Sequence, residues 1–388
     1  MVSLLIVVIY IAFISLGLPD SLLGSAWPAM FRDFDVPLSY AGIITMMIAG
    51  GTIISSLMSD RLTRRFGAGL VTAVSVLMTA VALFGFSISG SFFLLCLWAI
   101  PYGLGAGAID AALNNYVALH YASRHMSWLH CFWGVGAATS PYIMSYHLTR
   151  GLGWTSGYRF IAIIQVIVTV ILFLSLPLWK KKSVAVDQHK LSSTPLSLVQ
   201  TLKIKGVVIV LISFFSYIAL ETTAGLWASS YFVQYRGVDA EIAAKFASLF
   251  YLGITFGRFL NGFIADRIGD RRLIRFGSLI IVIGILMVGL PVAVNFLALI
   301  GLVVVGLGCA PIYPSIIHST PVNFGKNNSQ AIIGVQMASA YIGGTFIPPL
   351  FGLIADVISI GVYPVYLLFF ALLMFIMSER LIKKLARS

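Results

Sequence analysis

The chain has 388 residues, of which 59% are hydrophobic and only 10% are charged, and its mean hydropathy is +0.99. Because a soluble domain carries about 25% charged residues, this composition excludes a water-soluble globular protein and predicts a membrane protein. The net charge of +12 does not indicate nucleic-acid binding, since the basic residues lie between apolar runs, where they would meet anionic lipid headgroups.

Twelve apolar runs are long enough to cross a bilayer, which takes about 20 mostly apolar residues for about 30 Å of hydrocarbon. Such spans must be helical, because lipid offers no partner for backbone polar groups. In chain order they lie at residues 3–30, 38–58, 68–89, 92–119, 127–148, 159–179, 206–233, 241–264, 276–294, 296–319, 329–354 and 361–378. The sequence therefore predicts an all-α membrane protein with twelve transmembrane helices. The first run has no basic region before it and no small-residue cleavage site, so we expect it to be retained rather than removed as a signal peptide.

A polar stretch at residues 180–205 divides the chain almost in half. It contains three consecutive lysines and few apolar residues. This composition indicates a cytoplasmic linker between two six-helix bundles, residues 1–179 and 206–388, although an ordinary long loop is the alternative.

The basic residues fall mostly on one side of the predicted spans. If both termini are cytoplasmic, nineteen of the 25 lysines and arginines lie in cytoplasmic segments and four lie in outer loops. Because cytoplasmic loops carry the excess of positive charge, we expect a multi-pass protein of the plasma (inner) membrane with both termini in the cytoplasm.

Two pairs of motifs repeat at nearly the same offset. The loop segments 56–65 and 262–272 share an Asp-Arg pair followed by further arginine, and their aspartates are 206 residues apart. The helical segments 136–141 and 343–348 share a glycine and a proline at an offset of 207. Repeats of this kind indicate duplicated halves.

On these motifs the chain resembles the major facilitator superfamily over its whole length. Segment 262–272 is similar to the loop motif of that superfamily, whereas the earlier copy departs from it, with Ser56 and Thr63 in place of glycines. The resemblance implies two bundles that rock around a central cavity. An aspartate at a cytoplasmic helix end can pair with arginine and with a neighbouring helix N-terminus; a simple loop-orienting salt bridge is the alternative. The predicted gating residues are Asp60, Arg61, Arg64, Asp266, Arg267 and Arg271.

Three short motifs narrow the resemblance. The first span contains GLPDSL around Asp20, the fourth contains GAIDAALNN around Asp110, and the seventh contains YIALETT around Glu221. These motifs are similar to the fucose permease group, which contains sugar:proton symporters for fucose, glucose and related monosaccharides. The resemblance implies that Asp20 and Asp110 are the proton-coupling carboxylates.

The three acids are also informative in their own right, because an Asp at a helix centre costs about 2.5–3.5 kcal/mol on insertion scales. Asp20, Asp110 and Glu221 must therefore each face a cavity or a partner. A carboxylate that takes up a proton from one side and releases it to the other would couple transport to protons, and a structural carboxylate is the alternative. Counting along the helices places Asp20 and Asp110 at different depths, so the sequence leaves open whether they share one site.

Polar and aromatic side chains inside the spans complete a predicted sugar site. Amides and carboxylates suit sugar hydroxyls, and aromatic rings pack on the C–H face of a sugar. The predicted substrate-binding residues are Asn114, Asn115, His130, Trp227 and Gln336. The alternative is that they pack between helices, as such residues often do in membranes.

Four further residues have predicted structural roles. Arg258 is expected to pair with Asp266, two turns later, or to reach the cytoplasmic surface. Trp27, Trp154 and Trp179 lie near span ends and are expected to anchor the protein at the membrane interface.

We therefore predict a secondary active transporter that carries out proton-coupled symport of a monosaccharide or similar small polar solute by alternating access. A proton-driven drug or lipid exporter on the same scaffold is the alternative. A membrane enzyme would need a concentrated metal or nucleophile motif, and the sequence has none. With no ATP-binding loop and no Cys/His metal spacing, we expect no cofactor and no metal. The expected partners are a small-molecule substrate, protons and the lipid bilayer, without nucleic acid, for a chain that works as a monomer.

Overall fold

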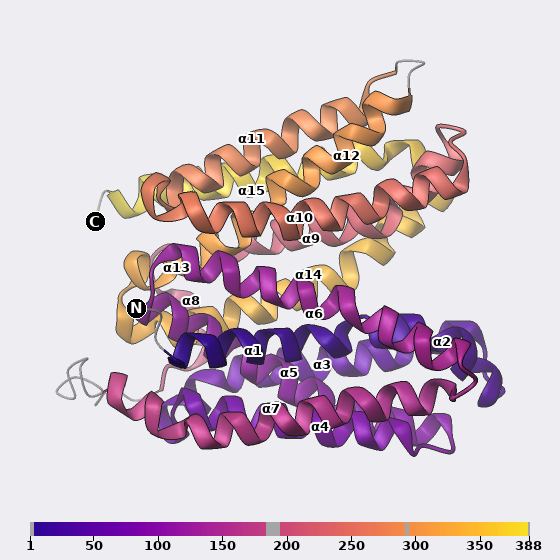
Figure 1. Cartoon of the computed structure of the whole chain (residues 1–388). Helices are drawn as coiled ribbons and strands as arrows, with labels where there is room; N and C mark the ends of the chain where they lie inside the picture. Colours follow the sequence, from indigo (N-terminus) through magenta and orange to yellow (C-terminus); the bar gives the residue numbers. More distant parts are fainter. Residues whose placement is uncertain (1–3, 184–194, 292–294, 387–388) are drawn as a thin grey trace. The chain divides into compact units, whose positions relative to one another are not determined.

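The computed structural model describes residues 4–183, 195–291 and 295–386, and all the regular structure in these ranges is helical (Figure 1). The chain begins with α1 (Leu4–Asp20), α2 (Leu22–Asp33), the short 3₁₀ turn η1 (Leu38–Tyr40), α3 (Ala41–Phe66), α4 (Ala68–Ser87), α5 (Phe92–His120), α6 (Ser123–Thr149) and α7 (Gly153–Ser183). It continues with α8 (Leu198–Lys203), α9 (Val207–Gln234), α10 (Ala240–Ile268), α11 (Asp270–Gly289), α12 (Asn295–Cys309), α13 (Ile312–Phe324), α14 (Lys326–Val357), η2 (Ile360–Val362) and α15 (Tyr363–Ala386).

Ten helical segments in the described part of the chain are long and apolar enough to cross a membrane. Two more helices, α6 and α10, have 27 and 29 residues but carry more polar side chains, such as Arg124 and Arg258. Together these segments correspond to the twelve spans expected from hydropathy, and the predicted all-α membrane fold is confirmed.

Two of the twelve spans are interrupted, which the hydropathy pattern did not predict. The first span breaks at Ser21, between α1 and α2, and the tenth breaks between α12 and α13. Pro19 has no N–H and its ring crowds the carbonyl of Ser15, so that carbonyl loses its helical partner. The Gln165 amide of α7 donates to it instead. At the second break Pro311 precedes α13, and a proline disfavours helical backbone in the residue before it.

Backbones approach closely where α1 meets α6. A Cβ added at Gly17 would overlap the carbonyl oxygen of Trp133, and one added at Gly136 would overlap that of Ile14. Small residues allow this approach, which is how membrane helices pack without a hydrophobic driving force.

We expect Gly17→Ala to destabilise the protein by about 1–3 kcal/mol, because the methyl group must push two backbones apart. The matched control is Gly24→Ala in α2, where nothing lies within 4 Å of the added Cβ; there alanine should be neutral or stabilise by up to about 1 kcal/mol. Unfolding of both purified variants in detergent checks the prediction. Equal effects at the two positions would contradict it.

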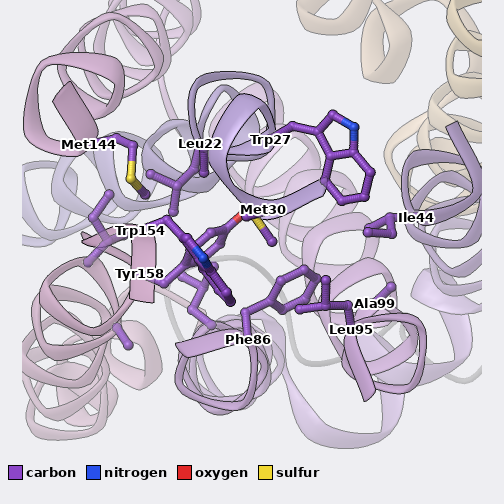
Figure 2. Close-up of a cluster of buried hydrophobic side chains, with 14 of the residues drawn as sticks. Leu22, Trp27, Met30, Ile44, Phe86, Leu95, Ala99, Met144, Trp154 and Tyr158 are labelled. Carbon is purple, nitrogen blue, oxygen red and sulfur yellow. The ribbon is translucent and has the colours of Figure 1, made fainter. Parts of the chain in front are cut away.

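The tryptophans near span ends are not interfacial anchors. Trp27 and Trp154 are each only 4% exposed and lie in an apolar cluster with Phe86 and Tyr158 (Figure 2). Their indole N–H groups donate within the protein, to the Leu38 carbonyl and the Asp33 carboxylate. Trp179 is also buried and donates to Ser175. The expectation of a lipid-facing belt was therefore wrong, because these indoles find their partners inside the helix packing.

The helices form two compact units. Unit 1 comprises Met1–Tyr116 and Leu129–Leu196, and unit 2 comprises Val117–Trp128 and Ser197–Ser388. Residues 184–194 of the predicted linker lie outside the described residues. After them Ser197 begins α8 with a capping box, in which its hydroxyl accepts from the Gln200 N–H and its own N–H donates to the Gln200 side chain.

Candidate functional site

Asp20 is the last residue of α1, and its side chain is exposed at the break before α2. The Tyr102 hydroxyl of α5 donates to one carboxylate oxygen at 3.1 Å, and the Trp133 indole of α6 donates to the other at 2.8 Å. The Ser21 hydroxyl donates to the Ala137 carbonyl at 2.5 Å, which ties the break to α6. The carboxylate is thus held by an aromatic pair and remains accessible, as a proton-exchanging group requires.

Asp110 belongs to a buried polar chain in the same unit. The Asn114 amide donates to the Asp110 carboxylate at 2.7 Å, and the other end of Asn114 lies 3.0 Å from Nε2 of His130. Because the Asn114 nitrogen faces the acid, its oxygen must face the imidazole, so His130 donates through Nε2. All three side chains are buried, and the Phe13 ring packs edge-on against His130. Three residues singled out from the sequence are therefore in direct contact.

The two aspartates of unit 1 are supported by the same two helices. On α5, Tyr102 and Asp110 are eight residues apart, or about 12 Å at 1.5 Å per residue. On α6, His130 and Trp133 are one turn apart. Asp20 and Asp110 therefore occupy different levels of one α5–α6 pair, as the count along the helices indicated.

The remaining predicted substrate residues have partners within the protein. Asn115, next to Asn114, is buried. In unit 2, Gln336 is fully buried and accepts from the Thr320 hydroxyl at 3.1 Å. The Trp227 indole donates to the Pro348 carbonyl at 2.9 Å. Their roles toward a substrate remain predictions.

Glu221 lies at the centre of a charged cluster in unit 2. Its carboxylate is 3.5 Å from the Arg258 guanidinium of α10 and accepts from the Tyr217 hydroxyl. Arg258 is only 3% exposed and lies over the Tyr313 ring, 5.9 Å from its centroid. The expectation that Arg258 pairs with Asp266 or reaches the surface was wrong, because Glu221 provides a closer counter-charge inside the bundle.

The two copies of the loop motif make different contacts. In α3, Asp60 is buried and pairs with Arg64 of the same helix at 2.8 Å. Arg61, Arg267 and Arg271 are exposed. Gating by these residues remains a prediction.

In unit 2, Asp266 contacts the start of α6. Its carboxylate accepts from the backbone N–H of Arg124 at 3.0 Å and lies 3.4 Å from the Arg124 side chain. Nearby, Asp270 accepts from Ser123 at 2.6 Å and pairs with His318 at 2.7 Å. An aspartate at a helix N-terminus is the geometry expected for this motif.

Sequence reasoning missed the hydroxyl partners of the acids, Tyr102 and Tyr217. Tyr217 precedes Glu221 by four residues, so a shared helix face was a usable signal. Tyr102 lies 82 residues from Asp20 in sequence, and no local pattern links the two. Asp270 and His318 were missed for the same reason.

Comparison with known proteins identifies relatives along the whole chain. The family model described as Major Facilitator Superfamily matches residues 9–247 and 209–384. "Bypass of stop codon protein 6" of Saccharomyces cerevisiae is 22% identical, covering 94% of this chain and 79% of its own length. The glucose/mannose transporter GlcP of Bacillus subtilis is 22% identical, covering 88% of this chain and 86% of its own length. Among solved structures, FucP, the fucose:proton symporter of E. coli, superimposes in its outward conformation with a TM-score of 0.79. It is 16% identical, and the match covers 97% of this chain and 98% of FucP.

Proposed function

The chain belongs to the Major Facilitator Superfamily, and we propose that it carries a monosaccharide or similar small polar solute together with protons by alternating access. It is a multi-pass membrane transporter rather than an enzyme, like its relatives. The names of GlcP and FucP, a glucose/mannose transporter and a fucose:proton symporter, support a sugar and proton coupling for this chain.

The exposed carboxylate of Asp20 at a helix break is the observation that carries the proposal. Discontinuous helices in transporters form substrate and coupling-ion sites. Asp20 has one neutral donor on each oxygen and no ion pair with an arginine or lysine among the described residues. The Tyr102 hydroxyl can donate or accept, so the ionised and the protonated forms both have hydrogen-bond partners. The Trp133 ring beside it is only half-buried and would pack on the C–H face of a sugar.

The other site residues take roles in the same proposal. Asp110 and Glu221 are further proton-coupling acids, with Asn114 and His130 linking Asp110 to the substrate site. Asn115, Trp227 and Gln336 contact the substrate once the helices around them have moved. The gating residues are those of the two loop motifs. We place a monomer in the plasma membrane with both termini cytoplasmic, and side-specific labelling of the termini in intact cells tests that orientation.

Uptake of radiolabelled glucose and fucose into proteoliposomes tests the proposal. With an inward proton gradient we expect accumulation of at least one sugar, which collapses when an ionophore abolishes the gradient. Protein-free liposomes are the control. If neither sugar accumulates, whereas a hydrophobic cation or a lipid is moved, the sugar assignment is wrong.

A further inference from the structure

A single phenolic hydrogen faces two acceptors in unit 2. The Tyr217 hydroxyl of α9 contacts the carboxylate of Glu221 and, 3.0 Å away, the carbonyl oxygen of Cys309. Tyr217 and Cys309 are both fully buried, so water does not supply a second donor to the Cys309 carbonyl. A phenol has one hydrogen, and it therefore satisfies one of these acceptors at a time.

The second acceptor lies at the interruption of the tenth span. Cys309 is the last residue of α12, and α13 begins at Ile312. The carbonyl of a terminal helical residue has no partner in its own helix. Cys309 is fully buried, so an unpaired carbonyl there costs free energy that a donor such as Tyr217 offsets. The Tyr217 hydroxyl therefore helps to stabilise the joint between α12 and α13, that is, the two residues between Cys309 and Ile312.

The protonation state of Glu221 decides where the hydrogen points. An ionised carboxylate has acceptors only and takes the Tyr217 hydrogen, leaving the Cys309 carbonyl without it. When a proton from solution forms an O–H bond on Glu221, the acid donates its own hydrogen to the Tyr217 oxygen. Tyr217 keeps its hydrogen throughout and turns it to the Cys309 carbonyl. No other bond forms or breaks.

The charged and polar groups around Glu221 also affect the joint between α12 and α13. Four groups interact with Glu221: Arg258 and Tyr251 from α10, Tyr217 from its own helix and the Cys309 thiol from α12. Tyr313 of α13 lies against Arg258. Arg258 is buried and its Nε has no hydrogen-bond partner among the described residues. Protonation of Glu221 removes the anion paired with Arg258, whose guanidinium then has the Tyr313 ring of α13 as its neighbour.

We propose that Tyr217 is a positioning residue that transmits protonation of Glu221 to the joint between α12 and α13. The inference rests on the proposed function, because it supplies the step by which one bound proton changes the shape of a transport helix. Proton-driven and proton-independent transport should then respond differently to loss of the Tyr217 hydroxyl.

Tyr217→Phe separates the two kinds of transport. We expect uptake driven by a proton gradient to fall about tenfold, since one hydrogen bond to a charged group is lost, while sugar counterflow at equal pH stays within about twofold. The matched control is Tyr363→Phe, which removes an equally buried phenol that donates only to the Ala224 carbonyl, at 2.8 Å; both activities should survive there. Equal loss of both activities in Tyr217→Phe, or no loss, would overturn the inference.

Infrared difference spectra between high and low pH give a readout that needs no substrate. We expect a protonated carboxyl band that disappears in Glu221→Gln, shifts to higher frequency in Tyr217→Phe because the acid loses its acceptor, and stays in place in Tyr363→Phe. A band that Tyr217→Phe leaves unmoved overturns the inference. If the band shifts while the wild type takes up no sugar, the link through Tyr217 is supported and the proposed substrate is wrong.

Discussion

Glu221→Leu is expected to destabilise the protein by about 3–5 kcal/mol, because it leaves the Arg258 guanidinium buried without its counter-charge. Removing the other partner, by Arg258→Leu, should reduce the free energy of unfolding by less. A carboxylate that loses its partner can take up a proton and become neutral, whereas a guanidinium stays charged in proteins. The glutamate side chain is also 16% exposed, against 4% for the arginine. The pair is therefore asymmetric, and loss of the glutamate side chain costs more than loss of the arginine side chain.

The double variant Glu221→Leu/Arg258→Leu should recover most of the lost stability, because two apolar residues replace a buried pair without an orphaned charge. Equilibrium unfolding in mixed micelles measures all three variants. The control is Arg275→Leu, which breaks the pair with Glu379, where the side chains are 49% and 24% exposed; because exposed ion pairs contribute little, that change should leave stability almost unchanged. A double variant as unstable as Glu221→Leu would show that the charges are not coupled.

The number and order of the spans could be predicted from the apolar runs of the sequence, including the more polar α6 and α10, and their helical form follows because lipid leaves backbone polar groups no other partner. The interruptions could not, although Pro19 and Pro311 mark them. A proline in a membrane helix is tolerated when a neighbour satisfies the freed carbonyl, as Gln165 does for Ser15. Whether such a neighbour exists depends on tertiary packing, which a single sequence does not reveal.

The acids of the site were found because charge inside a bilayer is costly, and Asn114 was found beside Asp110, but the partners that other helices supply to Asp20 and Glu221 were not. Trp133 lies 113 residues from Asp20 in sequence, and only the fold brings its indole to the carboxylate. Arg258 was assigned to the wrong acid because helical spacing favours a neighbour two turns away over one on another helix. Local periodicity therefore predicts which residues share a face, and leaves open which faces meet.

Asp20→Asn is expected to reduce gradient-driven sugar uptake to the level of protein-free liposomes. The amide has nearly the same shape and still accepts through its oxygen, but it no longer binds and releases a proton. Because the side chain is exposed, the new NH₂ group finds water as a partner, so the fold should be retained. Counterflow at equal pH should persist, since exchange of sugar for sugar needs no net movement of protons.

The matched control for this change is Asp33→Asn. Asp33 ends α2 in the same span and, like Asp20, accepts from an indole, that of Trp154 at 2.7 Å. If coupling depends on the proton at the helix break, Asp33→Asn keeps gradient-driven uptake while Asp20→Asn loses it. Asp110→Asn tests whether the second acid also takes part in proton coupling. Loss of gradient-driven uptake in this variant would assign coupling to both Asp20 and Asp110, whereas retained uptake would assign it to Asp20 alone. Gradient-driven accumulation that survives in Asp20→Asn would remove this carboxylate from the coupling mechanism.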